Sequence, residues 1–91
     1  MKKATMLQSV FEKPVQVVLG RQGITSVVGP EQATQCLTSG FWPDKSGVAF
    51  ENAMSACLKS LSGVCAPEMA REAFISAARR AHILVEDEIA H

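Results

Sequence analysis

Apolar and polar residues alternate over residues 15–19 (VQVVL), a run that is also rich in β-branched side chains. Alternation of this kind is typical of a half-buried strand. A second β-branched run, residues 24–28, follows the loop Gly20–Gly23, whose two glycines readily adopt positive φ. The two runs predict an antiparallel β-hairpin. Pro14 cannot donate to a strand ladder and marks the start of the hairpin, so residues 1–13 are predicted to form a flexible N-terminal arm.

Three later segments repeat apolar residues every three to four positions, which is the period of a helix. The first opens at Pro30, because proline is pre-organised for the first helical turn, and Gly40 ends it. The second covers residues 48–61, and Gly63 beyond it fits a left-handed C-cap. The third opens at Pro67 and carries two arginines near its C-terminal end, where cations are favoured.

Small residues dominate the apolar face of the third helix, so a neighbouring helix can approach it closely. We therefore expect the second and third helices to pack as an antiparallel pair around Phe74. The run Ile83–Val85 is apolar and is a candidate third strand, since a hairpin alone is only marginally stable in water. The predicted fold class is α+β, with an antiparallel β-hairpin packed on three α-helices in a single domain, residues 14–88.

The composition fits a small globular domain. The chain has 91 residues, of which 47% are apolar and 20% charged, and a chain this short holds one hydrophobic core. Because burial at this length barely exceeds the lost conformational entropy, self-association is a natural source of extra burial. Nine basic residues balance nine acidic ones. Without net positive charge, the chain lacks the electrostatic attraction that nucleic acids and anionic membranes exert on basic domains, so we expect neither as a partner.

The chain carries no predicted export or membrane segment. Its start, MKKATMLQS, is basic but lacks the apolar run of a secretory signal, and no stretch approaches the roughly 18 apolar residues of a membrane span. The three cysteines, Cys36, Cys57 and Cys65, are odd in number and lie in or beside apolar helical patterns, as reduced, buried thiols do. We therefore expect a cytoplasmic protein without a disulfide.

Residue types that perform catalysis or bind metals are present at unsuitable spacing. The cysteines form no CxxC pair with histidines at ligand spacing, so they are expected to be packing residues rather than zinc ligands or reactive thiols. His82 follows the basic end of the third helix and is expected to cap it, and His91 is the last residue. Glu68, Glu72 and Arg71 indicate a solvated charged face. The sequence predicts no catalytic, cofactor-binding or metal-binding residue.

The most distinctive feature is the aromatic linker Phe41, Trp42 and Pro43 between the first two helices. One interpretation is a core plug that holds the hairpin against the helices. The other is an interaction surface, because tryptophan is enriched at the centres of protein interfaces. The burial of Trp42 distinguishes the two interpretations.

Several of these features occur together in a known family. The hairpin, Trp42-Pro43, the series Ala53, Cys57, Leu61 and Gly63, and the runs Ala70–Ala78 and Ile83–Val85 resemble short bacterial proteins catalogued as domain of unknown function 982. The resemblance covers nearly everything from Pro14 to Val85. The chain departs from it at Arg80 and His82, where the family is expected to carry an acidic residue and a glycine. A histidine replaces a C-terminal glycine only with backbone strain or a different cap.

The resemblance implies the fold and no activity. The leading functional hypothesis is a non-enzymatic module that binds protein or forms a homodimer, through the hairpin edge or the aromatic linker. The alternative is a small-ligand binder or enzyme with a pocket between hairpin and helices, which requires convergent polar groups in a concave site. Nucleic-acid binding is the third hypothesis, and the neutral net charge argues against it.

Overall fold

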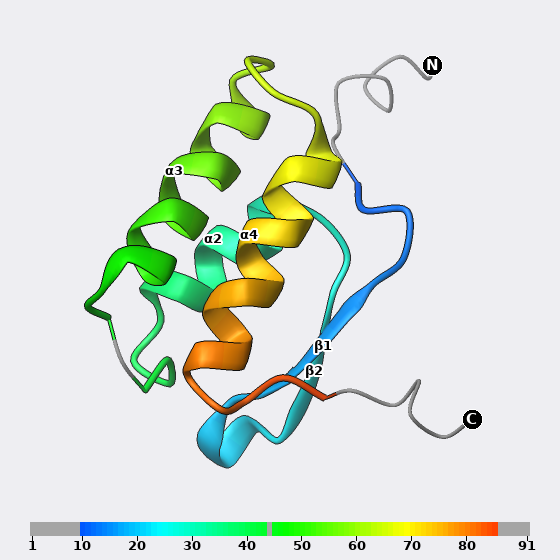
Figure 1. The fold of residues 1–91 in the computed structure, drawn as a ribbon. Helices are drawn as coiled ribbons and strands as arrows, with labels where there is room; N and C mark the ends of the chain where they lie inside the picture. The colour runs from blue at the N-terminus through cyan, green and yellow to red at the C-terminus, as the bar shows by residue number, and fades with distance from the viewer. Residues whose placement is uncertain (1–9, 44, 86–91) are drawn as a thin grey trace.

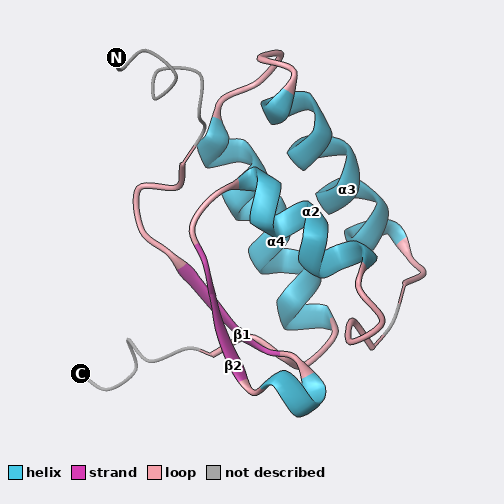
Figure 2. Cartoon of the chain, turned by 180° about the vertical axis from the view of Figure 1, so that it is seen from behind, coloured by secondary structure: helices cyan, strands magenta, loops and turns pink. Residues whose placement is uncertain are grey.

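The computed structural model of the chain describes residues 10–43 and 45–85. The elements in chain order are strand β1 (Val15–Val18), the 3-10 turn η1 (Gly20–Gln22), strand β2 (Ile24–Val27) and helices α2 (Pro30–Thr38), α3 (Val48–Leu61) and α4 (Pro67–Arg80). The helices form one layer, and the hairpin lies against one side of it (Figures 1 and 2). This confirms the predicted α+β class. Of the helices in the described ranges, none is long and apolar enough to cross a membrane.

The hairpin has the register that its alternating sequence predicts. β1 and β2 pair antiparallel, with Val15 opposite Val27, and residues of β1 are buried and exposed in turn. The connection closes with a 3.0 Å hydrogen bond from the N–H of Leu19 to the carbonyl of Gly23. Gly20 and Gly23 have φ angles of 49° and 75°, which only glycine adopts cheaply. The sequence-based hairpin is therefore confirmed, together with the reason for its two loop glycines.

The C-terminal run Ile83–Val85 returns to the hairpin and lies beside β1 (Figure 1). The N–H of Val18 donates to the carbonyl of Ile83 at 2.8 Å, and the N–H of Val85 donates to the carbonyl of Gln16 at 2.9 Å. These bonds enclose one isolated antiparallel bridge, so within the described residues the sheet itself keeps two strands. The candidate third strand is thus reduced to a single bridge, which nonetheless occupies the edge of β1.

Helix α3 has the predicted bounds and ends in a Schellman motif. The N–H of Gly63 bonds the carbonyl of Ser60 at 3.0 Å, and the N–H of Val64 bonds the carbonyl of Lys59 at 2.8 Å. This motif needs one residue in the left-handed region. Gly63 supplies it with a φ of 82°, as its position in the sequence predicts.

Helix α4 ends in the same motif, but with a histidine in the left-handed position. The N–H groups of His82 and Ile83 bond the carbonyls of Arg79 and Ala78 at 3.1 and 3.0 Å. His82 has a φ of 63°, and no other non-glycine residue in the described ranges has a positive φ. The C-terminus of α4 therefore has the backbone conformation that a C-terminal glycine usually adopts, although the residue there is a histidine. Of the two outcomes expected at this histidine, backbone strain is the one observed, and it costs about 1 kcal/mol.

Replacing this histidine with glycine should stabilise the protein. We expect His82→Gly to raise the free energy of unfolding by about 0.5–1 kcal/mol, because the left-handed strain is removed. Urea unfolding followed by circular dichroism measures it. The matched control is Gly63→Ala, which places a Cβ at the equivalent position of α3, where it meets no atom within 4 Å. This control should lose a similar amount through strain alone. An unchanged stability in His82→Gly would show that the histidine is accommodated without strain.

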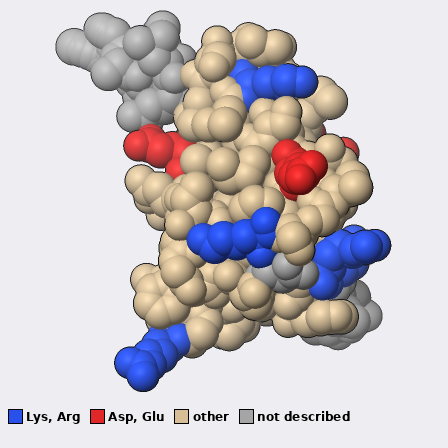
Figure 3. Space-filling view, turned by 90° about the vertical axis from the view of Figure 1, so that its left-hand side faces the viewer, with Lys and Arg blue, Asp and Glu red and all other residues tan. Residues whose placement is uncertain are grey.

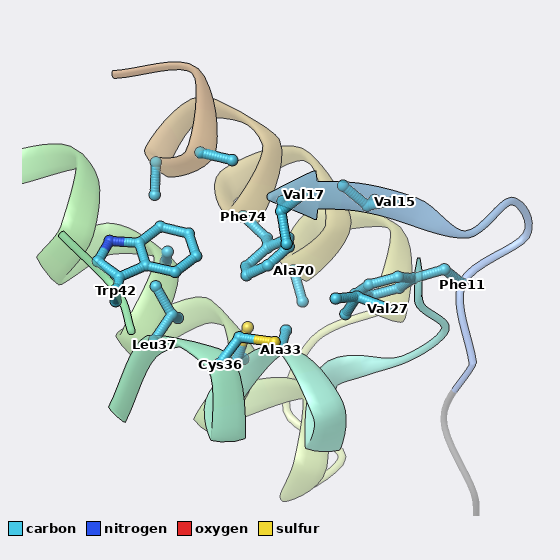
Figure 4. Packing of buried hydrophobic residues seen from close by; sticks show 14 of the residues in the cluster. Phe11, Val15, Val17, Val27, Ala33, Cys36, Leu37, Trp42, Ala70 and Phe74 are labelled. Atoms are coloured by element: carbon cyan, nitrogen blue, oxygen red, sulfur yellow. The ribbon is translucent and has the colours of Figure 1, made fainter. Parts of the chain in front are cut away.

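Apolar side chains from the hairpin, the linker and all three helices meet in one core (Figure 4). Phe74 of α4 is fully buried, and its ring centroid lies 5.5 Å from that of Trp42. Alanines of α3 and α4 are buried, and the two helices run antiparallel, side by side (Figure 1). The expected helix pair, with Phe74 in the core, is therefore confirmed.

The segment before β1 is tied to the domain at two points. Phe11, which the sequence places in the flexible arm, is instead buried near Val27 (Figure 4) and donates its N–H to the carbonyl of Val28 at 2.7 Å. Nε of Arg71 donates to the carbonyl of Lys13 at 2.8 Å. The ordered domain therefore begins before Pro14. The rest of the predicted arm, residues 1–9, and residues 86–88 of the predicted domain lie outside the described residues.

Candidate functional site

Trp42 is a core residue. Its side chain is 3% exposed and packs at a tilted angle of 47° against Phe74. Its Nε1 atom has no hydrogen-bond partner among the described residues, so packing rather than hydrogen bonding holds the indole in place. Because the Trp42 side chain is buried, it acts as the core plug of the first interpretation. Its ring is therefore not part of an exposed interaction surface.

Phe41 and Pro43, the other two residues of that candidate surface, remain exposed. Phe41 is 42% exposed, and its N–H donates to Oγ of Ser39 at 3.2 Å. Atom Cδ1 of its ring lies 3.4 Å from the position that a Cβ on Gly20 would take. The ring therefore bridges the linker and the hairpin turn, and a side chain at Gly20 would crowd it.

A groove beside Phe41 separates the hairpin from α2. It has a volume of about 360 Å³ and is lined by neutral residues, with Leu19, Cys36 and Phe41 as its less polar part and Gln22, Thr25, Gln32, Gln35 and Ser39 as its polar part. Oε1 of Gln32 already accepts the N–H of Val28 at 2.9 Å. The pocket expected between hairpin and helices is thus present as a shallow neutral groove, which we call the Phe41 groove.

The outer edge of β2 is a second candidate. The N–H of Val18 and the carbonyl of Gln16 point away from β2 and bond the C-terminal run. In an antiparallel pair, two residues that face each other either both direct their backbone groups inward or both direct them outward. The residues opposite Val18 and Gln16 are Ile24 and Ser26, so the backbone groups of these two point toward the outer edge of β2. Among the described residues, Ile24 and Ser26 have no backbone partner on that side. Ile24 is 65% exposed and Val18 beside it 40% exposed. Within residues 10–43 and 45–85, the hairpin therefore presents a strand edge without a pairing partner, next to exposed apolar side chains.

The sequence predicts the hairpin edge as a candidate binding region, but it does not identify the residues that form this edge. Those residues follow from the register, which places Ile24 and Ser26 on the outer side. One sequence signal was available: residues 22–30 contain no charged side chain. Edge strands are usually protected from pairing by charges, proline or bulges, so an uncharged run on the hairpin indicates an unprotected edge.

The buried cysteines are packing residues. Burial raises the pKa of both Cys36 and Cys57, and that of Cys57 rises to about 11 although a hydrogen bond with Thr34 opposes the shift. A thiol with a raised pKa stays protonated and is a poor nucleophile. Sγ of Cys65 lies 3.6 Å from the carbonyl oxygen of Ala56, a distance suited to a weak S–H donor. All three cysteines are free.

The remaining chemical candidates are not brought together. His82 is exposed at the end of α4, and Arg71 reaches the backbone of Lys13 instead of pairing with Glu68 along its own helix. In residues 10–43 and 45–85, no three His, Cys, Asp or Glu side chains form a group that could hold a metal ion.

Comparisons with known proteins agree with this fold. Among curated proteins, none matches the sequence. The protein Atu1219 of Agrobacterium tumefaciens, solved by NMR, is 38% identical and superposes with a TM-score of 0.72, over 87% of this chain and 78% of that one. The family described as protein of unknown function (DUF982) matches residues 13–85, which is most of the domain. The chain therefore belongs to the DUF982 family.

Proposed function

We propose that this protein is an interaction module that forms a homodimer through the outer edge of β2. The observation that carries the proposal is that the outward-facing backbone groups of Ile24 and Ser26 have no partner among the described residues, on an edge without charges. Exposed strand edges pair with other strands, and the main-chain hydrogen bonds supply much of the affinity. The exposed side chain of Ile24 adds apolar area beside the edge.

The geometry of the edge suits a second copy of the same strand. In an antiparallel pair with a two-fold axis at Thr25, Ile24 exchanges N–H···O bonds with the partner's Ser26, and Ser26 does so with the partner's Ile24. Thr25 then faces the partner's Thr25, and a threonine pair across strands is favourable. The chain has no net charge, so two copies do not repel each other over long distances. Pairing also extends a two-stranded sheet to four strands, which adds to the small core.

Light scattering coupled to size-exclusion chromatography tests the proposal. We expect the wild-type protein to run as a dimer at high concentration, and Ile24→Lys and Ser26→Lys to run as monomers, because each adds a charge at the two-fold interface. The matched control is Val18→Lys, which changes an exposed apolar residue on the inner strand, β1, of the same hairpin face and should stay dimeric.

Two outcomes would contradict edge pairing. A wild-type monomer at every concentration removes the proposal. Loss of the dimer in Val18→Lys and Ile24→Lys, but not in Ser26→Lys, would show that copies associate through the outer face of the hairpin instead of its edge.

The Phe41 groove supports a second candidate, the binding of a small neutral ligand. Its amide and hydroxyl side chains, next to the exposed ring of Phe41, resemble the mixture of apolar wall and few polar groups that ligand sites use. The same light-scattering series distinguishes the two candidates. If the protein only binds a ligand in the Phe41 groove, both the wild type and Ile24→Lys are monomers.

A further inference from the structure

The groove between α3 and α4 combines a hollow surface with positive charge. Its volume is about 410 Å³, and it is lined by Val48, Ala49 and Asn52 from α3 and by Ala73, Ser76 and two C-terminal arginines from α4. A smaller hollow of about 220 Å³ continues it around the first turn of α3 and also includes Arg80. We call the two together the α3–α4 groove. It lies apart from the Phe41 groove and from β2, with which it shares no lining residue.

Arg80 is not needed to complete the end of its own helix. Carbonyls in the last turns of α4 accept hydrogen bonds from the N–H groups of Ala81, His82 and Ile83. A cationic side chain often bonds such carbonyls at a helix end, but here backbone N–H groups already do so. The Arg80 side chain is exposed, and within the described part of the chain no ion pair of Arg80 is seen. Its guanidinium is therefore available to a molecule that enters the groove.

The lining of the groove carries basic side chains. None of the described lining residues is acidic. Helix α3 begins there at Val48, and its N-cap residue Gly47 supplies no side-chain cap. Glu51 lies in the first turn of α3 but does not line the groove. The partial positive charge of the helix N-terminus lies on the same side as that of the arginine. On the α3 side of the molecule, Lys and Arg side chains lie across the lower half of the view and also near its top, and the described acidic ones lie in the upper half (Figure 3).

We propose that the α3–α4 groove binds a small organic anion through Arg80. A guanidinium pairs with a carboxylate or phosphate group through two parallel hydrogen bonds. Asn52 and Ser76 supply neutral donors from the two facing helices. Val48, Ala49 and Ala73 form an apolar wall against which a short carbon chain packs. The ligand is thus an oxyanion on a small apolar body, and the site does not depend on self-association.

NMR titration of the full ¹⁵N-labelled chain tests the site. The probes are sodium butyrate and butyl phosphate, with sodium chloride at equal ionic strength as the reference. We expect saturable amide shifts confined to residues 47–52 and 73–80. Arg80→Gln should weaken binding about tenfold, because a charge-assisted hydrogen bond is lost. Arg21→Gln, which removes an exposed basic residue on η1, should bind as the wild type does.

The spectrum of each variant also shows that it is folded, so loss of binding is not confused with unfolding. Saturation by either probe supports the site, and the tighter probe identifies the oxyanion group. Equal shifts with chloride, unchanged affinity in Arg80→Gln, or shifts spread over other basic residues would each overturn the proposal.

Discussion

Phe74→Ala should lower the free energy of unfolding by about 3–5 kcal/mol, the cost of removing a buried phenyl ring that neighbours cannot replace. Phe74 is fully buried and its ring packs against Trp42, so the substitution leaves a cavity at the centre of the core. Domains of this size are stable by only about 5–15 kcal/mol. We therefore expect the variant to be partly unfolded at 37 °C. Urea unfolding followed by circular dichroism measures the loss.

The control for this substitution lies on the same helix. Met69 is 59% exposed, so Met69→Ala should change the free energy of unfolding by no more than about 0.5 kcal/mol. If Phe74→Ala also lost less than about 1 kcal/mol, the Phe74 and Trp42 pair would not be the centre of the core, and the role of Trp42 as a core plug would be wrong.

The stability of the protein should fall as pH rises from about 9 to 11. Burial raises the pKa of the Cys57 thiol from its ordinary value of 9.0 to about 11. The unfolded chain therefore releases this proton first, and each pH unit between the two values favours unfolding by up to about 1.4 kcal/mol. Burial also raises the pKa of Cys36, which acts in the same direction. Below pH 9 both thiols are protonated in either state, and their contribution is constant.

Urea unfolding under reducing conditions at several pH values measures this slope. The chain contains no tyrosine, so no phenol contributes to this slope. Cys57→Ala is the matched variant, and its stability should depend less on pH over this range. A slope that is the same in wild type and Cys57→Ala would mean that the thiol ionises as readily in the fold as in the unfolded chain.

The elements that the sequence predicts well are those with a local physical cause. Helix α3 has the predicted bounds because its apolar period and Gly63 beyond it agree. The hairpin follows from alternation and its loop glycines. The strain at His82 was predictable as one of two alternatives, since a histidine stood where a C-terminal glycine was expected.

The features that sequence reasoning missed depend on contacts between distant residues. Arg71 bonds the backbone of Lys13, 58 positions away, and no local pattern encodes such a contact. The burial of Phe11 also depends on where Val28 lies in the fold. For Trp42, the same residue type suits a core and an interface, so only its position against Phe74 decides the matter.

The two proposed surfaces place different demands on the molecule. Edge pairing uses backbone groups of β2, so many different uncharged side chains are compatible with it. A charged side chain on this edge would oppose the pairing. The α3–α4 groove depends on one guanidinium between two helices, and it remains open whether or not the hairpins pair. A dimer would therefore carry two such grooves, one on each helical layer.

An isotope-filtered NMR experiment tests edge pairing most directly. Equal amounts of ¹³C-labelled and unlabelled protein are mixed, and cross-peaks between labelled and unlabelled copies are selected. Antiparallel pairing around Thr25 predicts an Hα-to-Hα contact between Thr25 and the partner's Thr25, because such a non-hydrogen-bonded pair brings the two Cα atoms to about 4.5 Å. Intermolecular contacts confined to other surfaces, or none at concentrations where light scattering shows a dimer, would contradict it.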